Sequence, residues 1–485
     1  MRPTVHLLSE ELIERIVAEA RDLLCTLGVE IHNPGVLELL HGHGARIDAA
    51  AQRAFFTPDI IDRSLESAPH GFKLYDSLGQ EAVDLSGDRT NYTPGSAAIT
   101  ILDHGADRSR RPAAADYVRY AKLMCGLPNL ASQSTAFIPQ DVPEKIQDSY
   151  RLYLSLGFCE KPVVTGCFTV EAFELMKDLQ LAVRGSAEAL AARPLTIFSC
   201  CPTAPIKWSD VTSQNVVDCA RFGIPVEYIS MPLSGFMAPV TMVGSLIQHT
   251  AETLSGVAIS QLTRPGTPVL YGGSPAVFDV RYETTPMGDI GTMMIDCAYN
   301  EIGKSLGLPT QAYIGLSDAK LLDAQAGFES AAGALLAALS GINNCSGSGM
   351  LDFESCFSLE KLVLDNEICG SALHLLRGIT PKEDFPARAR FEEMLAEGHL
   401  LISAHTRRHL RQEHYLPGPV IDRANKSRWA EEGGKTLGER ARAEVERLVA
   451  AHRPVRLDSG VKQQLTRLMN AAALRAGIDR LPVSI

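Results

Sequence analysis

The chain has 485 residues, 45% of them hydrophobic, with 39 Gly and 27 Pro, which is enough for one large α/β domain with additions or for two domains. Its formal net charge of −11 and the lack of a Lys/Arg block argue against a nucleic-acid-binding protein. No run approaches the roughly 18 apolar residues of a membrane span, and acidic residues stand where a signal peptide would have its apolar core. We therefore expect a cytoplasmic protein with eleven reduced cysteines and no membrane partner.

Residues 1–85 carry amphipathic helical patterns, of which SEELIERIVAEARDLLCTLG (9–28) is the clearest. We expect this N-terminal helical segment to pack on the flank of the domain that follows.

From residue 86 to 380, short β-prone runs alternate with apolar helical segments, the pattern typical of βαβ units. The expected strands are 90–95, 131–138, 162–166, 194–200, 225–230, 268–273, 310–315 and 342–347, and helices are expected at 241–262, 288–306 and 322–339. About eight such units in about 290 residues match a (β/α)8 TIM barrel better than an open doubly wound sheet. No G-x-G-x-x-G follows a strand, which weakens the dinucleotide-binding alternative.

Residues 381–485 form a charged C-terminal helical extension, with RFEEMLAEGHLL at 390–401 as an example. A solvated addition and an oligomerisation arm are both open at this point, and a homo-oligomer is possible.

The expected strands tend to begin after Pro and to end in Gly or Ser, which places the active site of such a barrel at the C-terminal strand ends. No nucleophile-elbow, zinc-protease or P-loop motif is present, so no catalytic residue can be named. Aromatic faces attract cations, and several of them together suit a quaternary ammonium, although strand aromatics also fill cores. The candidate substrate-binding residues are Tyr92, Gln133, Phe198, Glu227, Tyr228, Phe236, Tyr271, Phe278, Arg281, Tyr313, Asp318, Asn343 and Cys345.

Cys200 and Cys201 are adjacent thiols at the end of an expected strand, followed by Pro202. Zinc would need third and fourth ligands, and neither a C-x-x-C pair nor a histidine stands at ligand spacing. We therefore expect no bound metal. His249 lies inside an expected helix and is more typical of a core histidine than of a site residue.

Four stretches carry a family resemblance: MPLSGFMAPVTMVGSLIQHTAE (231–252), residues 271–310, GLSDAKLLDAQAGFESAAGALLAALSGINN (315–344) and GMLDFESCFSLEKLVLDNEICG (349–370). They resemble the trimethylamine methyltransferase family in its branch without pyrrolysine, whose characterised members demethylate glycine betaine and related quaternary amines. The resemblance implies a (β/α)8 barrel and methyl transfer to the Co(I) of a corrinoid. The D-x-H-x-x-G cobalt-ligand motif of corrinoid proteins is absent, so the cobamide should arrive on a partner protein.

The same resemblance implies that the position of pyrrolysine in the trimethylamine enzymes corresponds to a place near Tyr313–Asp318. A quaternary ammonium leaves as a neutral tertiary amine, so its demethylation needs no general acid, and positioning in a dry site can suffice.

The leading hypothesis is a quaternary-amine:corrinoid methyltransferase with glycine betaine as substrate, whose carboxylate Arg281 or backbone N–H groups could receive. The alternatives are a zinc-dependent thiol methyltransferase that uses Cys200 and Cys201, and a non-catalytic protein that binds quaternary amines.

Overall fold

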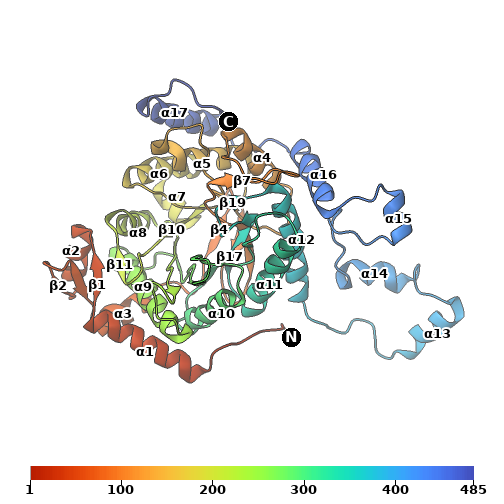
Figure 1. The fold of residues 1–485 in the computed structure, drawn as a ribbon, viewed down its shortest axis with the longest axis horizontal. Coiled ribbons are helices and arrows are strands. Elements are labelled where there is room, and N and C mark those ends of the chain that lie inside the picture. The colour runs from red at the N-terminus through yellow and green to blue at the C-terminus, as the bar shows by residue number, and fades with distance from the viewer. Residues whose placement is uncertain (1) are drawn as a thin grey trace.

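The computed structural model describes residues 2–485 and has short parallel strands at its centre, surrounded by helices (Figure 1). One sheet has the order β14-β12-β10-β9-β8 and a second has the order β16-β17-β6, with every pairing in both parallel. The strands are β6 (Asn91–Pro94), β8 (Gln133–Ser134), β9 (Val163–Thr165), β10 (Thr196–Cys200), β12 (Val226–Tyr228), β14 (Val269–Leu270), β16 (Gln311–Tyr313) and β17 (Asn344–Ser348). Seven of the eight runs expected as strands contain one of them, and the eighth, 342–347, overlaps β17, which ends one residue later.

Backbone hydrogen bonds also join the edges of the two sheets. The Ala131 N–H donates to the Tyr92 carbonyl (2.8 Å) between β8 and β6. Where β14 meets β16, the Tyr271 N–H donates to the Pro309 carbonyl (2.8 Å), and the Gln311 N–H donates to the Tyr271 carbonyl (3.1 Å). The protein is thus an α/β fold with two parallel sheets that are bonded edge to edge.

The helices between these strands cover the outer faces of the sheets (Figure 1). They are α4 (Ala114–Met124), α5 (Glu144–Phe158), α6 (Val170–Arg184), α7 (Ala187–Ala192), α8 (Asp210–Phe222), α9 (Met242–Thr263), α10 (Ile290–Ser305), α11 (Ala324–Ser340) and α12 (Leu359–Leu375). The three helices expected from the sequence correspond to α9, α10 and α11. The local sequence sets both ends of helix α11, because Asp323 caps its first turn and Gly341 ends it with a left-handed backbone.

The N-terminal segment contains α1 (Glu10–Thr26), α2 (Pro34–Gly42) and α3 (Pro58–Ser67), and α1 and α3 pack on α9. It also contains strands, whereas we expected helices alone: β1 (Val29–Ile31), β2 (Arg46–Asp48) and β3 (Arg53–Phe55) join β11 (Lys207–Trp208), and β4 (Lys73–Tyr75) pairs with β5 (Glu81–Asp84). Strands of two to four residues are too short to produce a readable alternation of hydrophobicity.

The β4–β5 hairpin covers the N-terminal ends of the central strands. Leu74, Val83 and Leu85 of the hairpin form one buried apolar cluster with side chains from β9, β10 and β14, namely Val164, Ile197 and Leu270. Polar groups between the sheets therefore lie toward the other end, where the strands finish.

Loops after the strands carry further short strands on the C-terminal side. They are β7 (Thr100–Ile101), β13 (Leu233–Ser234), β15 (Ala276–Val277), β18 (Met350–Leu351) and β19 (Cys356–Phe357). Strand β13 pairs with β15, and β19 pairs with both β18 and β7. These pairings tie neighbouring loops together around the strand ends.

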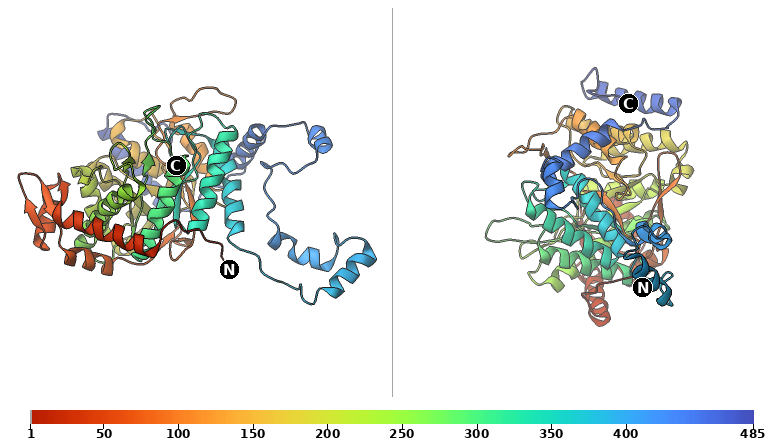
Figure 2. Two further views of the ribbon diagram at one scale, coloured as in Figure 1. Left: turned by 60° about the horizontal axis from the view of Figure 1, so that its bottom comes forward. Right: turned by 90° about the vertical axis from the view of Figure 1, so that its right-hand side faces the viewer.

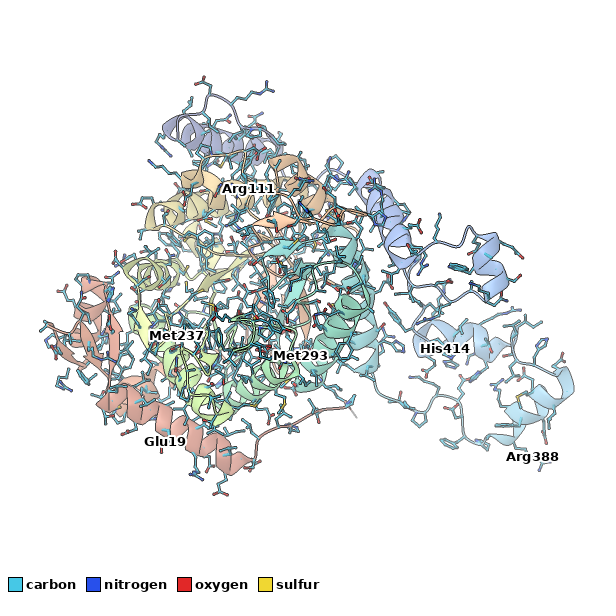
Figure 3. All side chains as sticks on the ribbon, in the orientation of Figure 1. Glu19, Arg111, Met237, Met293, Arg388 and His414 are labelled. Carbon is cyan, nitrogen blue, oxygen red and sulfur yellow. The ribbon has the colours of Figure 1, made fainter. Side chains whose placement is uncertain are left out.

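The C-terminal extension contacts the body through residues 412–420, where Tyr415 and Gly418 bond to Glu367 of α12 and Val420 is buried, and again through its last two helices. Helix α16 (Leu437–Ala450) packs on α12 and α4, and α17 (Ser459–Arg475) packs on α5 and α6. Before them, α13 (Arg388–Glu397), α14 (Ala404–Glu413) and α15 (Lys426–Glu431) contain no buried residue. We call residues 379–433 the arm; its helices extend away from the body in Figure 1 and in the left view of Figure 2. Figure 3 shows Arg388 and His414 on it, apart from Met237 and Met293 of the body.

Close packing of α9 on β12 generates a stability prediction. A Cβ added at Gly256 of α9 would lie 2.6 Å from the Tyr228 ring and 3.0 Å from Trp208. Gly256→Ala should therefore destabilise the protein by about 1–3 kcal/mol in chemical denaturation. The control is Gly327→Ala in α11, where nothing lies within 4 Å and the change should stabilise by about 0.5–1 kcal/mol. Equal effects of the two substitutions would contradict this packing.

Candidate functional site

A buried polar group lies between the two sheets, centred on Glu227 of β12. Its two carboxylate oxygens accept hydrogen bonds from the Ser199 hydroxyl of β10 (2.7 Å) and from the Asn344 side-chain amide of β17 (3.0 Å). Burial raises the pKa of Glu227 to about 7, and these two bonds offset only part of that effect. Because Ser199 and Asn344 belong to different sheets, the inner faces of the sheets meet at this carboxyl.

Tyr313 lies on the same inner face at the end of β16. Its hydroxyl donates to the Ser96 carbonyl (3.3 Å), in the loop that follows β6. Its register partner on β17 is Ser346, whose hydroxyl is buried without a hydrogen-bond partner among residues 2–485. The side-chain Nε2 of Gln311, two residues earlier on the same face, is likewise buried and unpartnered within the described chain.

Glu354 reaches the same place from the loop between β18 and β19. Asp352, Phe353 and Glu354 all have positive φ (50°, 54° and 68°), a left-handed turn that three non-glycine residues adopt only at a cost. Oε1 of Glu354 is buried without a partner in residues 2–485, and a Cβ added at Gly95 would lie 3.3 Å from it. Tyr313 and Glu354 thus flank the same segment, Gly95–Ser96.

Asp296 of α10 is a second buried carboxylate without a partner. Both of its oxygens are buried and unpaired among the residues described, and 1% of the residue is exposed. The neighbouring Tyr299 hydroxyl lies within 3.1 Å of the Gly273 carbonyl oxygen and 2.9 Å of the Gln311 carbonyl oxygen, so its proton is already shared between them. Burial, and then the charge of Glu354, raise the pKa of Asp296 well above its ordinary value.

No cation offsets these acids. Burial and then Asp318 raise the pKa of Glu354, and no lysine, arginine or histidine in residues 2–485 acts in the opposite direction on Glu354 or Asp296. Burial also raises the pKa of Tyr313 well above 10, with Glu354 and Glu227 as the next causes. The strand ends therefore surround a region that favours positive charge.

Several of the expected site residues point outward into the helical layer instead. The Tyr92 hydroxyl donates to the Ala334 carbonyl of α11 (2.7 Å), and the Tyr271 hydroxyl donates to Thr250 of α9 (2.8 Å). Phe198 packs edge-on against Phe173 of α6, Tyr228 packs edge-on against Trp208, and the Cys345 thiol donates to the Ile342 carbonyl.

Two expected site residues lie toward the beginning of the strands. The Gln133 amide donates to the Lys161 carbonyl just before β9 (2.9 Å). The Asn343 side chain accepts from the Thr310 N–H (2.9 Å) and donates to the Gly87 and Arg89 carbonyls. Both hold backbone at the end of the sheets away from Tyr313.

The other expected residues lie in the loops after the strands. Phe236 and Phe278 stack on each other with ring centroids 4.9 Å apart. Arg281 is 76% exposed and pairs with Asp279 (2.6 Å). Asp318 accepts from the Met287 and Gly288 N–H groups (2.9 and 2.8 Å), and burial raises its pKa to about 6.

The adjacent thiols occupy different surroundings. Cys200 is buried, whereas Cys201 is partly exposed, and burial raises the pKa of Cys201 to about 12. In residues 2–485, no three His, Cys, Asp or Glu side chains are grouped so that they could hold a metal ion. His249 is fully buried in α9, close to the Gly272 carbonyl, and burial lowers its pKa to about 3.

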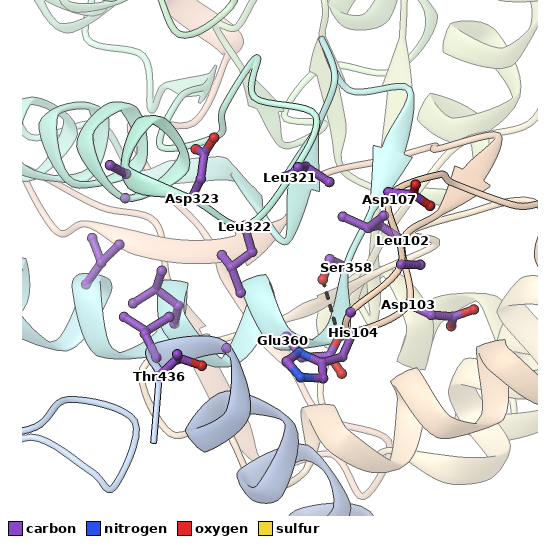
Figure 4. Close-up of a pocket in the computed structure, with 18 of the residues that line it drawn as sticks. Leu102, Asp103, His104, Asp107, Leu321, Leu322, Asp323, Ser358, Glu360 and Thr436 are labelled. Carbon is purple, nitrogen blue, oxygen red and sulfur yellow. Dashed lines mark hydrogen bonds between the residues drawn. The ribbon is translucent and has the colours of Figure 1, made fainter. Parts of the chain in front are cut away.

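A separate pocket of about 840 Å³ lies outside the strands, between loop 102–107, loop 321–324, α12 and the start of α16 (Figure 4). The His104 ring lies beside Glu360 there, and Ser358 donates to Glu360 (3.4 Å). Burial raises the pKa of Glu360. None of the thirteen expected site residues lines this pocket, which we call the outer pocket.

Sequence reasoning did not select Ser199, Gln311, Asn344, Asp296 or Glu354. Ser199 pairs in register with Glu227 and Gln311 lies two residues from Tyr313, so strict alternation along the strands could have indicated these two, and then Asn344 as the register partner of Gln311. Asp296 on a helix and Glu354 on a loop carry no comparable signal.

The α/β fold is similar to that of a methylamine methyltransferase of known structure. A crystal structure of MtmB with hydroxylamine matches with a TM-score of 0.51 at 11% identity, covering 91% of this chain and 88% of that one. The Methanosarcina barkeri monomethylamine methyltransferase matches with a TM-score of 0.50 at 11% identity, covering 97% of this chain and 88% of that one.

The chain belongs to the trimethylamine methyltransferase (MTTB) family, whose model matches residues 1–472. It is 28% identical to the glycine betaine methyltransferase of Desulfitobacterium hafniense, over 96% of each chain. It is 25% identical to a trimethylamine methyltransferase MttB of the same species, over 97% of this chain and 95% of that one, and 28% identical to MttB of Methanosarcina barkeri, over 96% and 95%. The family resemblance read from the sequence is confirmed, and the chain is a methyltransferase by family.

No helix within residues 2–485 combines the length and the apolarity needed to cross a bilayer.

The raised pKa of Glu227 generates a prediction about stability and pH. A carboxyl whose pKa is about 7 when folded and about 4.5 when unfolded destabilises the fold progressively as pH rises between those values. Glu227→Gln removes this dependence, so its unfolding free energy relative to the native protein should improve by roughly 3 kcal/mol between pH 4 and pH 8. Urea unfolding at both pH values measures this, with Glu11→Gln at an exposed position of α1 as the control. Parallel pH profiles would mean that Glu227 ionises normally.

Proposed function

We propose that the protein transfers a methyl group from a quaternary amine, with glycine betaine as the first substrate to test, to the Co(I) of a corrinoid carried on a separate protein. The observation that carries the proposal is the full-length similarity to a glycine betaine methyltransferase. The cation-favouring strand ends support a positively charged substrate. Of the expected site residues, Tyr313 and Glu227 lie on the inner face and are the ones we propose to face it.

We further propose that the eight central strands close into a (β/α)8 barrel. The edge-to-edge hydrogen bonds and the bond from Asn344 to Glu227 between the sheets support closure. On this proposal, residues 1–85 pack on the barrel, 86–380 form it, and 381–485 extend from it. The substrate would then sit where barrel enzymes place their chemistry, at the C-terminal strand ends.

The chemistry of the proposed reaction suits these surroundings. The cobalt nucleophile attacks a methyl carbon, the C–N bond breaks, and its electron pair remains on nitrogen, so the amine leaves neutral. No proton has to be delivered to the leaving group. The protein's task is then to hold the cation and exclude water, which buried acids and the Tyr313 ring can do.

The acceptor corrinoid requires a surface at the strand ends against which its carrier protein can dock. Exposed apolar side chains gather in the loops after β12 and β14 and at the starts of α9 and α10. They are Met231, Phe236, Met237, Val240, Met242, Val243, Val280, Tyr282, Ile290 and Met294. We propose this apolar rim as the docking surface of the corrinoid protein, because it borders the site to which the cobalt must come and such patches mark interaction surfaces.

We propose that the arm packs against a second copy of the chain. Its exposed apolar residues are Ile379, Phe385, Phe391, Leu395, Leu401, Ile402, Leu410 and Leu416. Residues 412–420 anchor the arm to α12, but none of its three helices buries a residue, so these helices need another surface to cover them. All eleven cysteines are free thiols, which supports the proposal that the protein works in the cytoplasm.

The substrate proposal is tested by an anaerobic assay of Co(I) cobalamin methylation with glycine betaine, choline, carnitine, proline betaine, γ-butyrobetaine and trimethylamine. We expect turnover of at least one quaternary amine and none of trimethylamine, because the chain has no pyrrolysine and demethylation of unactivated trimethylamine would have to expel a dimethylamide anion, a poor leaving group. Equal rates with trimethylamine would refute the substrate assignment while leaving the family intact.

The arm proposal is tested by light scattering on the size-exclusion peak. The native chain should elute as an oligomer, and Phe385→Asp with Leu395→Asp should shift it to the monomer because charges replace apolar contacts. The control is Leu474→Asp on α17, a residue that is 62% exposed outside the arm. A monomeric native chain, or an arm variant that keeps the native mass, would contradict the proposal.

A further inference from the structure

The region around Tyr313 contains an unusual number of buried polar atoms that lack partners. Among residues 2–485 they are Oε1 of Glu354, both carboxylate oxygens of Asp296, Nε2 of Gln311 and the hydroxyl of Ser346. Buried polar groups in proteins are nearly always hydrogen-bonded, and exceptions cluster where a ligand completes them. Unpaired atoms of Glu354, Gln311 and Ser346 near Tyr313, with the unpaired Asp296 carboxylate on the Glu354 side of them, therefore indicate a site that is incomplete without its ligand.

The charge of the missing ligand follows from the acids. Two carboxylates, on α10 and on the loop after β18, approach each other closely enough for Glu354 to raise the pKa of Asp296. The titratable groups beside Glu354 are Tyr313, Asp318 and Cys201, and those beside Asp296 are Tyr299, Cys297 and Cys345, so all of them are acidic or neutral. Nothing in the described chain neutralises this arrangement, so an anion would be repelled and a cation attracted.

The backbone supports the same assignment. The left-handed turn at 352–354 places Glu354 over Gly95, where a larger residue would meet its carboxylate at 3.3 Å. A strained turn that ends in an unpaired buried acid gives the empty fold no stability. Its retention is understandable if the carboxylate contacts something that the free protein lacks.

We propose that Glu354 contacts the ammonium group of the substrate beside the Tyr313 ring, and that Asp296 supplies a second negative charge behind it. This inference rests on the proposed function and assigns its cation subsite. A quaternary ammonium donates no N–H bond, so it is recognised by charge and by aromatic faces, and a carboxylate next to Tyr313 offers both.

The affinity for the cation should depend on pH. Burial keeps both acids neutral to higher pH than usual in the empty protein, and a bound cation favours their ionised forms. Cation binding should therefore release protons and become tighter as pH rises, until the acids are already ionised in the free protein. Titration calorimetry in two buffers that differ in ionisation enthalpy measures the number of protons released.

The test is calorimetric titration of the full chain with tetramethylammonium and choline, with no corrinoid present. Glu354→Gln should weaken both by at least about tenfold, and Asp296→Asn should weaken them less. Because neither side chain has a partner to lose, both variants should melt at or above the native temperature, which a merely structural acid would not do. Glu360→Gln in the outer pocket is the matched control, a buried acid with a raised pKa that should leave affinity unchanged.

The inference is overturned if the native protein binds neither cation. It is also overturned if the variant that combines Glu354→Gln with Asp296→Asn binds both cations within twofold of the native affinity. The same holds if 3,3-dimethylbutan-1-ol, the neutral isostere of choline, binds as tightly as choline. Failure of the methyl-transfer assay with intact, Glu354-dependent cation binding would instead refute the proposed function alone. Methyl transfer that survives Glu354→Gln unchanged would refute only the inference.

Discussion

The central strands are buried on both faces, and this constraint sets the arrangement of the rest of the molecule. Successive side chains of a strand point to opposite faces, so each strand contributes one set to the helical layer and another to the space between the sheets. Apolar residues fill the outer set and the lower part of the inner set, where the β4–β5 hairpin closes the end. The upper part of the inner set is polar, and that is where Glu227 and Tyr313 lie.

Placing acids in this upper part is costly for the fold. Glu227 has two hydrogen-bond donors and its pKa is still raised to about 7, while Asp296 and Glu354 lack even those. Apolar residues at such positions commonly make a protein more stable. The acids are therefore better explained by what the site does with a cation than by what they do for the empty protein.

Much of the fold could be predicted from the sequence because strands and helices carry local signals. All eight central strands and the helices α9, α10 and α11 fall where β-prone runs and apolar periods indicated. The short strands of the N-terminal segment did not, since three or four residues carry little pattern and β1 pairs with β11, where Glu30 lies opposite Lys207, 177 residues further along the chain. Neither the edge-to-edge bonds nor the separation of the arm from the body has any sequence signature.

The candidate site was only partly predictable, and the reason is the direction in which side chains point. Residues near strand ends were chosen by type, so outward rings such as Tyr92, Tyr228 and Tyr271 were selected together with inward Tyr313. Aromatic residues are favoured on both faces of a buried strand, so residue type cannot separate the two. Glu354 depends on a left-handed turn of three non-glycine residues, which sequence patterns do not reveal.

The unpaired acids and the type of substrate fit together in physical terms. A quaternary ammonium has a permanent charge, so it cannot adapt its protonation to the site, and the site has to adapt instead. Burial raises the pKa of both acids when the site is empty and a bound cation favours their ionised forms, so the uncompensated buried charge is reduced in both states. An amine that can lose its own proton would not need this property.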